Sequence, residues 1–221
     1  RRVHVILPRI DIISPFLQKG SMMNIVCLDL EGVLVPEIWV AFAQKTKIEG
    51  FSRTTRDEPD YGKLMRYRLD LLDKHNLGLA EITDVIQTVE PFPGALEFLS
   101  KLRERTQVLI ISDTFEQFAR PLMRKLGWPT LFCNSLIVSD KGRIEGYSLR
   151  CENSKLTTVK ALQSCGFETI AAGDSFNDLG MIRASKAGFL FRTTDAIRRD
   201  NPDLRAFTEY DEFFNAIDEV L

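Results

Sequence analysis

The sequence predicts an α/β protein whose core is a parallel sheet with helices on both faces. Short apolar runs rich in β-forming residues, typical of buried strands, cover residues 25–28, 107–112, 168–172 and 187–191. From residue 91 onward such runs alternate with amphipathic helical patterns, which favours parallel strands joined by helices. Between Pro36 and Pro91 only helical patterns occur. We therefore expect a Rossmann-like core with a small helical cap inserted after the first strand.

Two further strand patterns surround a short turn. Residues 131–138 and 143–149 flank Asp140-Lys-Gly142, which is typical of a hairpin. Helical spacing of apolar residues predicts three helices in the insertion and six in the core: 37–44, 61–75, 79–88, 94–105, 115–126, 155–165, 179–185, 196–200 and 211–220.

Length and patterning divide the chain into three parts. A chain of 221 residues, 44% of them hydrophobic, can form one sizeable core and carry an insertion. We expect the core to comprise residues 23–35 and 91–221, and the cap to comprise residues 36–90. Charged residues interrupt the apolar start of residues 1–22, which we predict to be a loosely held leader or the remnant of an over-extended start. An additional strand is the alternative for this segment.

Charge and composition narrow the function classes. The net charge is −2 and no basic block is present, which argues against nucleic acid and anionic membranes as partners. The cysteines lack metal-type spacing, and they predict a reducing, cytoplasmic setting: Cys27, Cys133, Cys151 and Cys165. We expect a small-molecule substrate and either a monomer or a homodimer.

Polar clusters follow three of the predicted strands. Asp29 and Glu31 follow the first strand, Ser112 and Asp113 end the second, and Asp174-Ser-Phe-Asn177-Asp178 follows the third. Because parallel strands bring their carboxyl ends to one edge of a sheet, these clusters should converge in one crevice. Several carboxylates close together are stable when a hard cation lies among them, and Mg²⁺ prefers oxygen ligands. The sequence therefore predicts an Mg²⁺ site with Asp29 and Asp174 as its natural pair.

A carboxylate beside Mg²⁺ can also act as a nucleophile, as in enzymes that form an aspartyl phosphate. Asp29 would then attack phosphorus, and Glu31 would protonate the leaving oxygen. Ser112 and the backbone N–H groups near Asp113 would donate hydrogen bonds to the phosphoryl group, particularly if a helix begins there. Lys155, at the start of a helix, would supply positive charge.

These motifs resemble those of the haloacid dehalogenase superfamily of aspartate-nucleophile phosphatases. They occur in order as Asp29-Leu-Glu31-Gly-Val, Ile111-Ser112-Asp-Thr, Lys155 and Gly173-Asp174-Ser-Phe-Asn177-Asp178. The resemblance covers residues 24 to about 195 and implies a metal site formed by Asp29, Asp174 and the Glu31 backbone carbonyl. It also implies that Ser112, Asp113, Lys155 and Asn177 bind the phosphorylated substrate.

Within the superfamily the chain looks most like the phosphoserine phosphatases. That family uses a Glu just after the first motif to hold the substrate ammonium, where this chain has Glu37, and a cap Arg to grip the carboxylate, where it has Arg68. Glu31 replaces the usual Asp. With Thr54-Thr-Arg-Asp57, it makes the chain similar to bacterial phosphoserine phosphatases that also transfer the phosphoryl group to homoserine.

Several readings of individual residues stay open. Lys160 competes with Lys155, and Arg66 competes with Arg68. Ser112, Asp113 and Asn177 are also suitable helix caps, Trp39 suits either the cap core or the pocket wall, and Asp178 is expected to support the site rather than bind the metal directly.

We expect Mg²⁺-dependent hydrolysis of O-phospho-L-serine through an aspartyl phosphate, with phosphoryl transfer to homoserine as an additional activity. One alternative is a phosphatase of the same superfamily that acts on another small phosphorylated metabolite. The other is a non-catalytic metabolite-binding protein.

Overall fold

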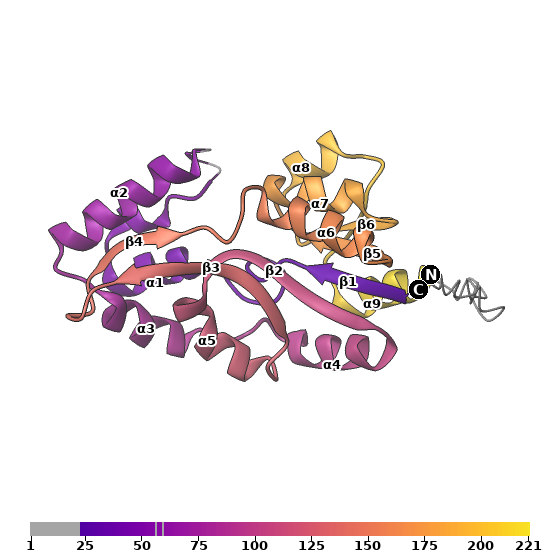
Figure 1. Ribbon diagram of the computed structural model, residues 1–221, viewed down its shortest axis with the longest axis horizontal. Helices are drawn as coiled ribbons and strands as arrows, with labels where there is room; N and C mark the ends of the chain where they lie inside the picture. The colour runs from indigo at the N-terminus through magenta and orange to yellow at the C-terminus, as the bar shows by residue number, and fades with distance from the viewer. Residues whose placement is uncertain (1–22, 56, 59) are drawn as a thin grey trace, which may run out of the picture.

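The computed structural model describes residues 23–55, 57–58 and 60–221. In this part of the chain, seven strands form one sheet in the order β4-β3-β2-β1-β5-β6-β7 (Figure 1). Only the pair β3–β4 is antiparallel; the other neighbours are parallel. The strands are β1 (Met23–Leu28), β2 (Gln107–Phe115), β3 (Thr130–Val138), β4 (Ile144–Ser148), β5 (Phe167–Gly173), β6 (Ala187–Phe191) and β7 (Arg205–Phe207).

Helices cover both faces of the sheet, as Figure 1 shows. The hydrophobic cluster on one face includes α4, α5 and α9, and the cluster on the other includes α6, α7 and α8. Their bounds are α4 (Ala95–Arg105), α5 (Glu116–Lys125), α6 (Ser154–Ser164), α7 (Leu179–Ala184), α8 (Asp195–Asp200) and α9 (Tyr210–Asp218). The predicted α/β fold with helices on both faces is therefore confirmed.

The central strand β1 determines where the site lies. It is hydrogen-bonded to β2 on one side and β5 on the other, and Leu28 is in register with both Ile110 and Ala172. The sheet order thus reverses direction at β1, which is the position where open α/β sheets form a ligand crevice. The residues that follow these three strands consequently lie side by side.

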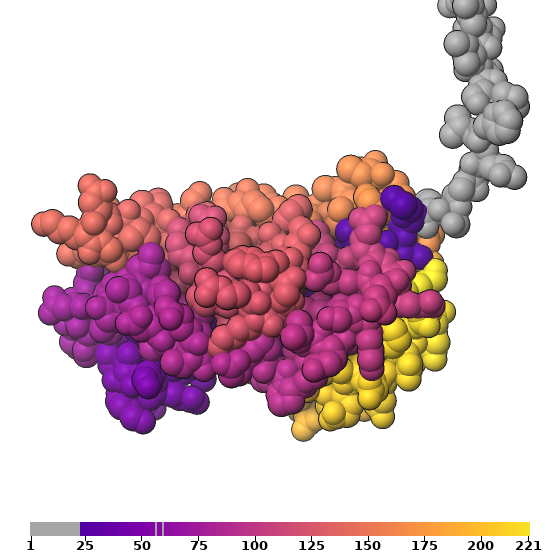
Figure 2. Space-filling view, turned by 90° about the horizontal axis from the view of Figure 1, so that it is seen from below, coloured from indigo at the N-terminus to yellow at the C-terminus, as the bar shows by residue number. Residues whose placement is uncertain are grey.

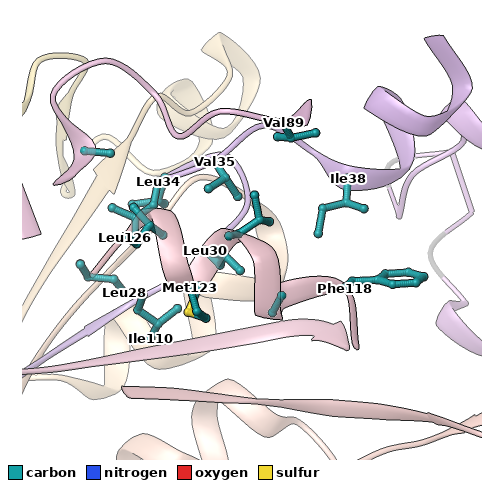
Figure 3. Close-up of a cluster of buried hydrophobic side chains, with 14 of the residues drawn as sticks. Leu28, Leu30, Leu34, Val35, Ile38, Val89, Ile110, Phe118, Met123 and Leu126 are labelled. Carbon is teal, nitrogen blue, oxygen red and sulfur yellow. The ribbon is translucent and has the colours of Figure 1, made fainter. Parts of the chain in front are cut away.

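The turn after β1 is anchored in the larger apolar cluster. Leu30, Val33, Leu34 and Val35 are all inaccessible to solvent. Figure 3 shows Leu30, Leu34 and Val35 among side chains from β1, β2 and α5. Burying these side chains stabilises a turn that would otherwise be a mobile loop, at about 1.5–3 kcal/mol for each large apolar side chain.

The segment from Pro36 to Glu90, hereafter the insert, contains three α-helices and one short 3-10 helix among its described residues. Its elements are α1 (Ile38–Thr46), η1 (Glu49–Ser52), α2 (Tyr61–Lys74) and α3 (Leu79–Thr88). The sequence predicts only helices in this segment, and its described residues form no strand. Figure 2 shows the insert, in indigo to purple, at the opposite end of the molecule from the yellow C-terminal residues.

The β3–β4 hairpin extends from the sheet onto the insert. Leu79 N donates to Gly142 O at 2.9 Å, and Arg143 Nη2 lies 2.5 Å from Asp73 Oδ2. The hairpin tip therefore contacts both α2 and α3. At the C-terminal end of α3, Lys125 Nζ donates to Gln87 O and Val89 O at 2.8 Å each.

Two features of the fold differ from the sequence prediction. Strand β2 continues to Phe115, beyond the predicted end at Ser112. Helix α5 begins at Glu116, within one residue of the predicted start at Phe115, so no helix begins at Asp113 itself. Strand β7 was not predicted because three residues are too short to show a pattern. Residues 1–22, predicted to be a leader or remnant, lie outside the described residues. In the described part of the chain, no helix has the length and apolarity needed to cross a membrane.

Candidate active site

A large cavity lies at the carboxyl ends of β1, β2 and β5, between these strands and the insert. Its volume is about 620 Å³. It is lined by all eight of the side chains predicted for catalysis and substrate binding, and by the metal ligand predicted in the fourth motif: Asp29, Glu31, Glu37, Arg68, Ser112, Asp113, Lys155, Asn177 and Asp174. The structure thus brings every predicted site residue to one cavity.

Asp29 stands directly after β1 and is buried. Its Oδ1 accepts a hydrogen bond from Leu30 N at 2.7 Å, and its Oδ2 lies 2.8 Å from Lys155 Nζ. Burial raises the pKa of Asp29 well above its usual value; the lysine opposes this effect, and the nearby Asp178 and Asp174 add to it. A cation close to this carboxylate would favour its ionised form.

Lys155 links Asp29 to Asp178. Its Nζ lies 2.5 Å from Asp178 Oδ1, and its side chain is 4% exposed. Burial lowers the pKa of Lys155, but attraction to Asp178 and Asp29 outweighs it, so the net pKa is well above the usual value. The lysine is therefore a fixed positive charge beside the predicted nucleophile. Lys160, its competitor in the sequence, is exposed.

Asp178 supports the loop after β5. Its Oδ2 accepts from the backbone N–H groups of Asp174 and Ser175, at 3.0 Å each. A Cβ on Gly173 would lie 2.1 Å from Asp178 Cγ, so this close approach requires a residue without a side chain. Because both Asp178 oxygens have protein partners, its geometry agrees with a supporting role.

The carboxylates of Asp29, Asp174 and Asp178 form a buried acidic cluster. One oxygen from each lies within 4.8 Å of the others. Gly32 has φ +78°, and a Cβ there would lie 2.4 Å from Asp174 Cγ, so the glycine lets this carboxylate approach the turn that contains Glu31. Three carboxylates facing one lysine leave excess negative charge, and their hard oxygen donors suit Mg²⁺. The residues present therefore fit the predicted cation.

Glu31 lies between the core and the insert. Its Oε2 accepts from Ile38 N, the first residue of α1, at 2.8 Å, and Thr114 also hydrogen-bonds it. Burial, followed by repulsion from Glu37, raises the pKa of Glu31 to about 8. A carboxyl group that holds its proton near neutral pH can act as a general acid.

Arg68 projects from α2 into the cavity and is 6% exposed. Its Nη2 donates to Arg53 O at 2.7 Å, and its guanidinium lies 4.6 Å from the centre of the Trp39 ring. Its Nε has no hydrogen-bond partner within the described chain. A buried donor without a partner costs about 1–3 kcal/mol, which an acceptor on a ligand would recover. Arg66, the alternative in the sequence, is exposed.

Asp113 connects four parts of the site. Its Oδ1 accepts from Ser154 Oγ at 2.8 Å, and its Oδ2 accepts from Asn177 Nδ2 at 2.9 Å. Its backbone carbonyl accepts from Tyr61 OH at 3.2 Å and from Asn134 Nδ2 at 3.1 Å. The side chains of Asp113 and Asn177 thus hydrogen-bond each other on the cavity wall, and neither residue is the N-cap of the helix that follows it.

Sequence reasoning did not identify Tyr61, Asn134 or Ser154 as site residues. Asn134 carries a usable signal, because it is a polar residue within the largely apolar strand pattern 131–138. Tyr61 and Ser154 carry no such signal in the sequence. Their roles depend on contacts with Asp113, which is 52 residues from Tyr61 and 41 residues from Ser154.

Trp39 lines the cavity and also packs against Phe42 and Phe51. It is therefore part of both the pocket wall and the apolar interior of the insert, the two places that its sequence position suits.

Residues 23–186 match the model of the haloacid dehalogenase-like hydrolases, and the chain belongs to this family. The predicted family is therefore confirmed. Among its relatives, "Phosphoserine phosphatase ThrH" of Pseudomonas aeruginosa is 50% identical over 86% of this chain and 93% of its own length. A protein of Pseudomonas syringae pv. tomato called phosphoserine phosphatase is 52% identical over 86% of this chain and 80% of its own.

Solved structures agree on the fold. A crystal structure of phosphoserine phosphatase in its apo form has a TM-score of 0.68 at 22% identity, over 85% of this chain and 94% of the other. A phospho-aspartyl intermediate analogue of phosphoserine phosphatase gives 0.68 at 23% identity, over 86% and 94% of the two chains. At these identities the likeness establishes the architecture alone.

Proposed function

We propose that the protein hydrolyses O-phospho-L-serine to L-serine and phosphate in an Mg²⁺-dependent reaction. The observation that carries this proposal is the buried, unpaired Nε of Arg68 in the same cavity as the Asp29–Lys155 pair. An Arg fork suits a carboxylate, and the lysine-bound aspartate suits a phosphoryl group. The two relatives described above, each about 50% identical and named phosphoserine phosphatase, support the same substrate.

The reaction would have two steps. Asp29 attacks phosphorus, the bond to the serine oxygen breaks, and Glu31 gives its proton to that oxygen. Glu31 then takes a proton from water, which attacks the aspartyl phosphate, releases phosphate and regenerates Asp29. Lys155 and the Ser112 hydroxyl stabilise the transferring group. Asp29, Asp174 and the Glu31 carbonyl would hold Mg²⁺, which supplies further positive charge beside the phosphoryl oxygens.

The amino-acid part of the substrate would lie against the insert. Arg68 would bind its carboxylate, and Glu37, at the N-terminus of α1 and on the cavity wall, would bind its ammonium. Asp113 and Asn177 would form the opposite wall of the substrate pocket. We also propose that residues 36–90 act as a cap on a core of residues 23–35 and 91–221, joined at Pro36 and at Pro91–Pro93.

A second acceptor, homoserine, is favoured by one observation. Glu31 reaches Ile38 N at the start of α1, so the acid/base carboxyl extends to the border of the insert, where an acceptor alcohol would enter. The aspartyl phosphate would then pass its phosphoryl group either to water or to the homoserine hydroxyl. A cytoplasmic location and a monomeric or homodimeric state remain predictions.

The deciding experiment is a product assay with phosphoserine and Mg²⁺, with and without homoserine. We expect release of inorganic phosphate, loss of activity on chelation of the metal, and formation of phosphohomoserine when homoserine is added. A panel of phosphate monoesters provides the comparison. If phosphoserine is no better a substrate than a generic ester, the substrate assignment is wrong.

A further inference from the structure

We infer that Tyr61 is a positioning residue that connects the insert to the phosphoryl-binding Ser112 through a single peptide group. The inference rests on the proposed phosphatase function. Tyr61 is the first residue of α2, and its hydroxyl donates to the carbonyl of Asp113 at 3.2 Å. This hydrogen bond joins the insert to the end of β2.

The peptide group between Asp113 and Thr114 is held at both ends. Its carbonyl accepts from Tyr61 OH and also from Asn134 Nδ2 on strand β3. Its N–H group, which belongs to Thr114, donates to Ser112 Oγ at 3.2 Å. Because a peptide group is planar, the orientation of its carbonyl also sets the direction of its N–H. Tyr61 therefore influences the position of the Ser112 hydroxyl.

The geometry leaves the Ser112 proton for the substrate. Ser112 is 3% exposed, and its oxygen accepts from Thr114 N. Within the described residues, the Ser112 hydroxyl has no hydrogen-bond acceptor, and it lines the cavity shared with Asp29 and Lys155. A hydroxyl that accepts one hydrogen bond and still has its own proton is a suitable donor to a phosphoryl oxygen.

Thr114 extends the same connection to the proton-transfer group, because it also hydrogen-bonds Glu31. The Asp113–Thr114 peptide group thus joins Tyr61 in the insert to Ser112 at the phosphoryl position, and the side chain of Thr114 joins it to Glu31. When α2 is in its observed place, Tyr61 can hold this peptide. If α2 moved away, Asn134 alone would hold the carbonyl.

Tyr61→Phe provides the test, with Tyr147→Phe as its matched control. The two rings pack edge to face with their centroids 5.8 Å apart, but no hydrogen bond from the Tyr147 hydroxyl occurs in the described part of the chain. We expect Tyr61→Phe to lower kcat/KM for phosphoserine about three- to ten-fold, the range for one neutral hydrogen bond. The melting temperature should stay close to that of Tyr147→Phe, which should retain wild-type kcat/KM.

Competitive inhibition separates positioning from direct contact with the amino acid. In Tyr61→Phe, the inhibition constant of inorganic phosphate should rise by about the same factor as kcat/KM falls, and that of L-serine should be unchanged. In the Ser112→Ala background, Tyr61→Phe should lower kcat/KM by less than about two-fold, because the effects of substituting two coupled residues do not add.

The inference would be overturned if Tyr61→Phe lowered kcat/KM by the same factor in the Ser112→Ala enzyme as in the wild type. It would also be overturned if L-serine inhibited the Tyr61→Phe enzyme more weakly than the wild type. A Tyr61→Phe enzyme with wild-type kinetics would overturn it too. A wild-type protein that does not hydrolyse phosphoserine would instead refute the proposed function.

Discussion

The two walls of the cavity differ in how completely their charged side chains are paired. On the core wall, Lys155 contacts both Asp29 and Asp178, and Asp178 also accepts two backbone hydrogen bonds. On the insert wall, Arg68 keeps an unpaired buried Nε. The charged groups of the core wall are therefore preorganised for phosphoryl chemistry, whereas the insert wall has a charged donor left for a ligand. This contrast suggests that reaction type and substrate choice are encoded in different parts of the chain.

The largest effect should come from the core wall. Asp29→Asn removes the proposed nucleophile while keeping nearly the same shape, so we expect kcat to fall by at least about 10⁴-fold. Steady-state phosphate release from phosphoserine measures this loss, and an acid-quench assay with ³²P-labelled substrate should detect no labelled protein. Full Mg²⁺-dependent activity in this variant would contradict the mechanism.

The preorganised wall is also the part that the sequence predicts best. Asp29 and Asp174 follow apolar strand runs, so their convergence follows from a parallel sheet. Lys155 lies at the start of a helix, and its place beside them was predicted from the order of the motifs. The sequence alone predicts that the carboxyl ends of β1, β2 and β5 meet. The register of β1 with β2 and β5 is seen only in the structure.

The insert wall is harder to predict because its contacts join distant segments. Arg68 could be distinguished from Arg66 only through resemblance, since both lie on one helix pattern. The hydrogen bond from Tyr61 to Asp113 spans 52 residues and leaves no periodic trace in the sequence. The extension of β2 to Phe115 was missed for a related reason: Ser112, Asp113 and Thr114 are polar residues that interrupt the apolar pattern while staying in the strand.

Lys155 should matter for folding as well as for chemistry. Lys155→Ala would leave Asp29 and Asp178 buried without their counter-charge, and breaking a buried ion pair costs about 3–5 kcal/mol. Urea unfolding should report this loss of stability. Lys160→Ala, on the exposed face of the same helix, should change the free energy of unfolding by less than about 0.5 kcal/mol. Equal stabilities for the two variants would refute the idea of a coupled Asp29–Lys155–Asp178 network.

A smaller and more selective effect should follow from changing the insert wall. Arg68→Ala removes a charge-assisted contact to the substrate carboxylate, so kcat/KM for phosphoserine should fall about 10- to 100-fold. Activity on p-nitrophenyl phosphate, which has no carboxylate, should change by less than about three-fold. Arg66→Ala, on the exposed side of α2, should leave both activities unchanged. An equal loss on both substrates would show that Arg68 supports the site in general rather than reading the amino acid.

The smallest expected effect concerns Glu31, which belongs to both walls. Glu31→Asp shortens the side chain by one methylene, about 1.5 Å, and so withdraws the carboxyl group from Ile38 N, its partner at 2.8 Å. The proton acceptor would then lie deeper in the core, closer to an attacking water than to an alcohol entering beside the insert. We expect the ratio of phosphohomoserine to inorganic phosphate to fall about three-fold or more in the presence of homoserine, while total turnover changes less.

Glu49→Asp is a matched control, because Glu49 is an exposed glutamate of the insert and the same methylene is removed there. Its product ratio should equal that of the wild type. A ratio that is also unchanged in Glu31→Asp would mean that the length of this side chain does not select the acceptor. The choice between water and homoserine would then have to come from the residues that bind the acceptor's amino-acid group, Glu37 and Arg68, and the two walls would be functionally independent.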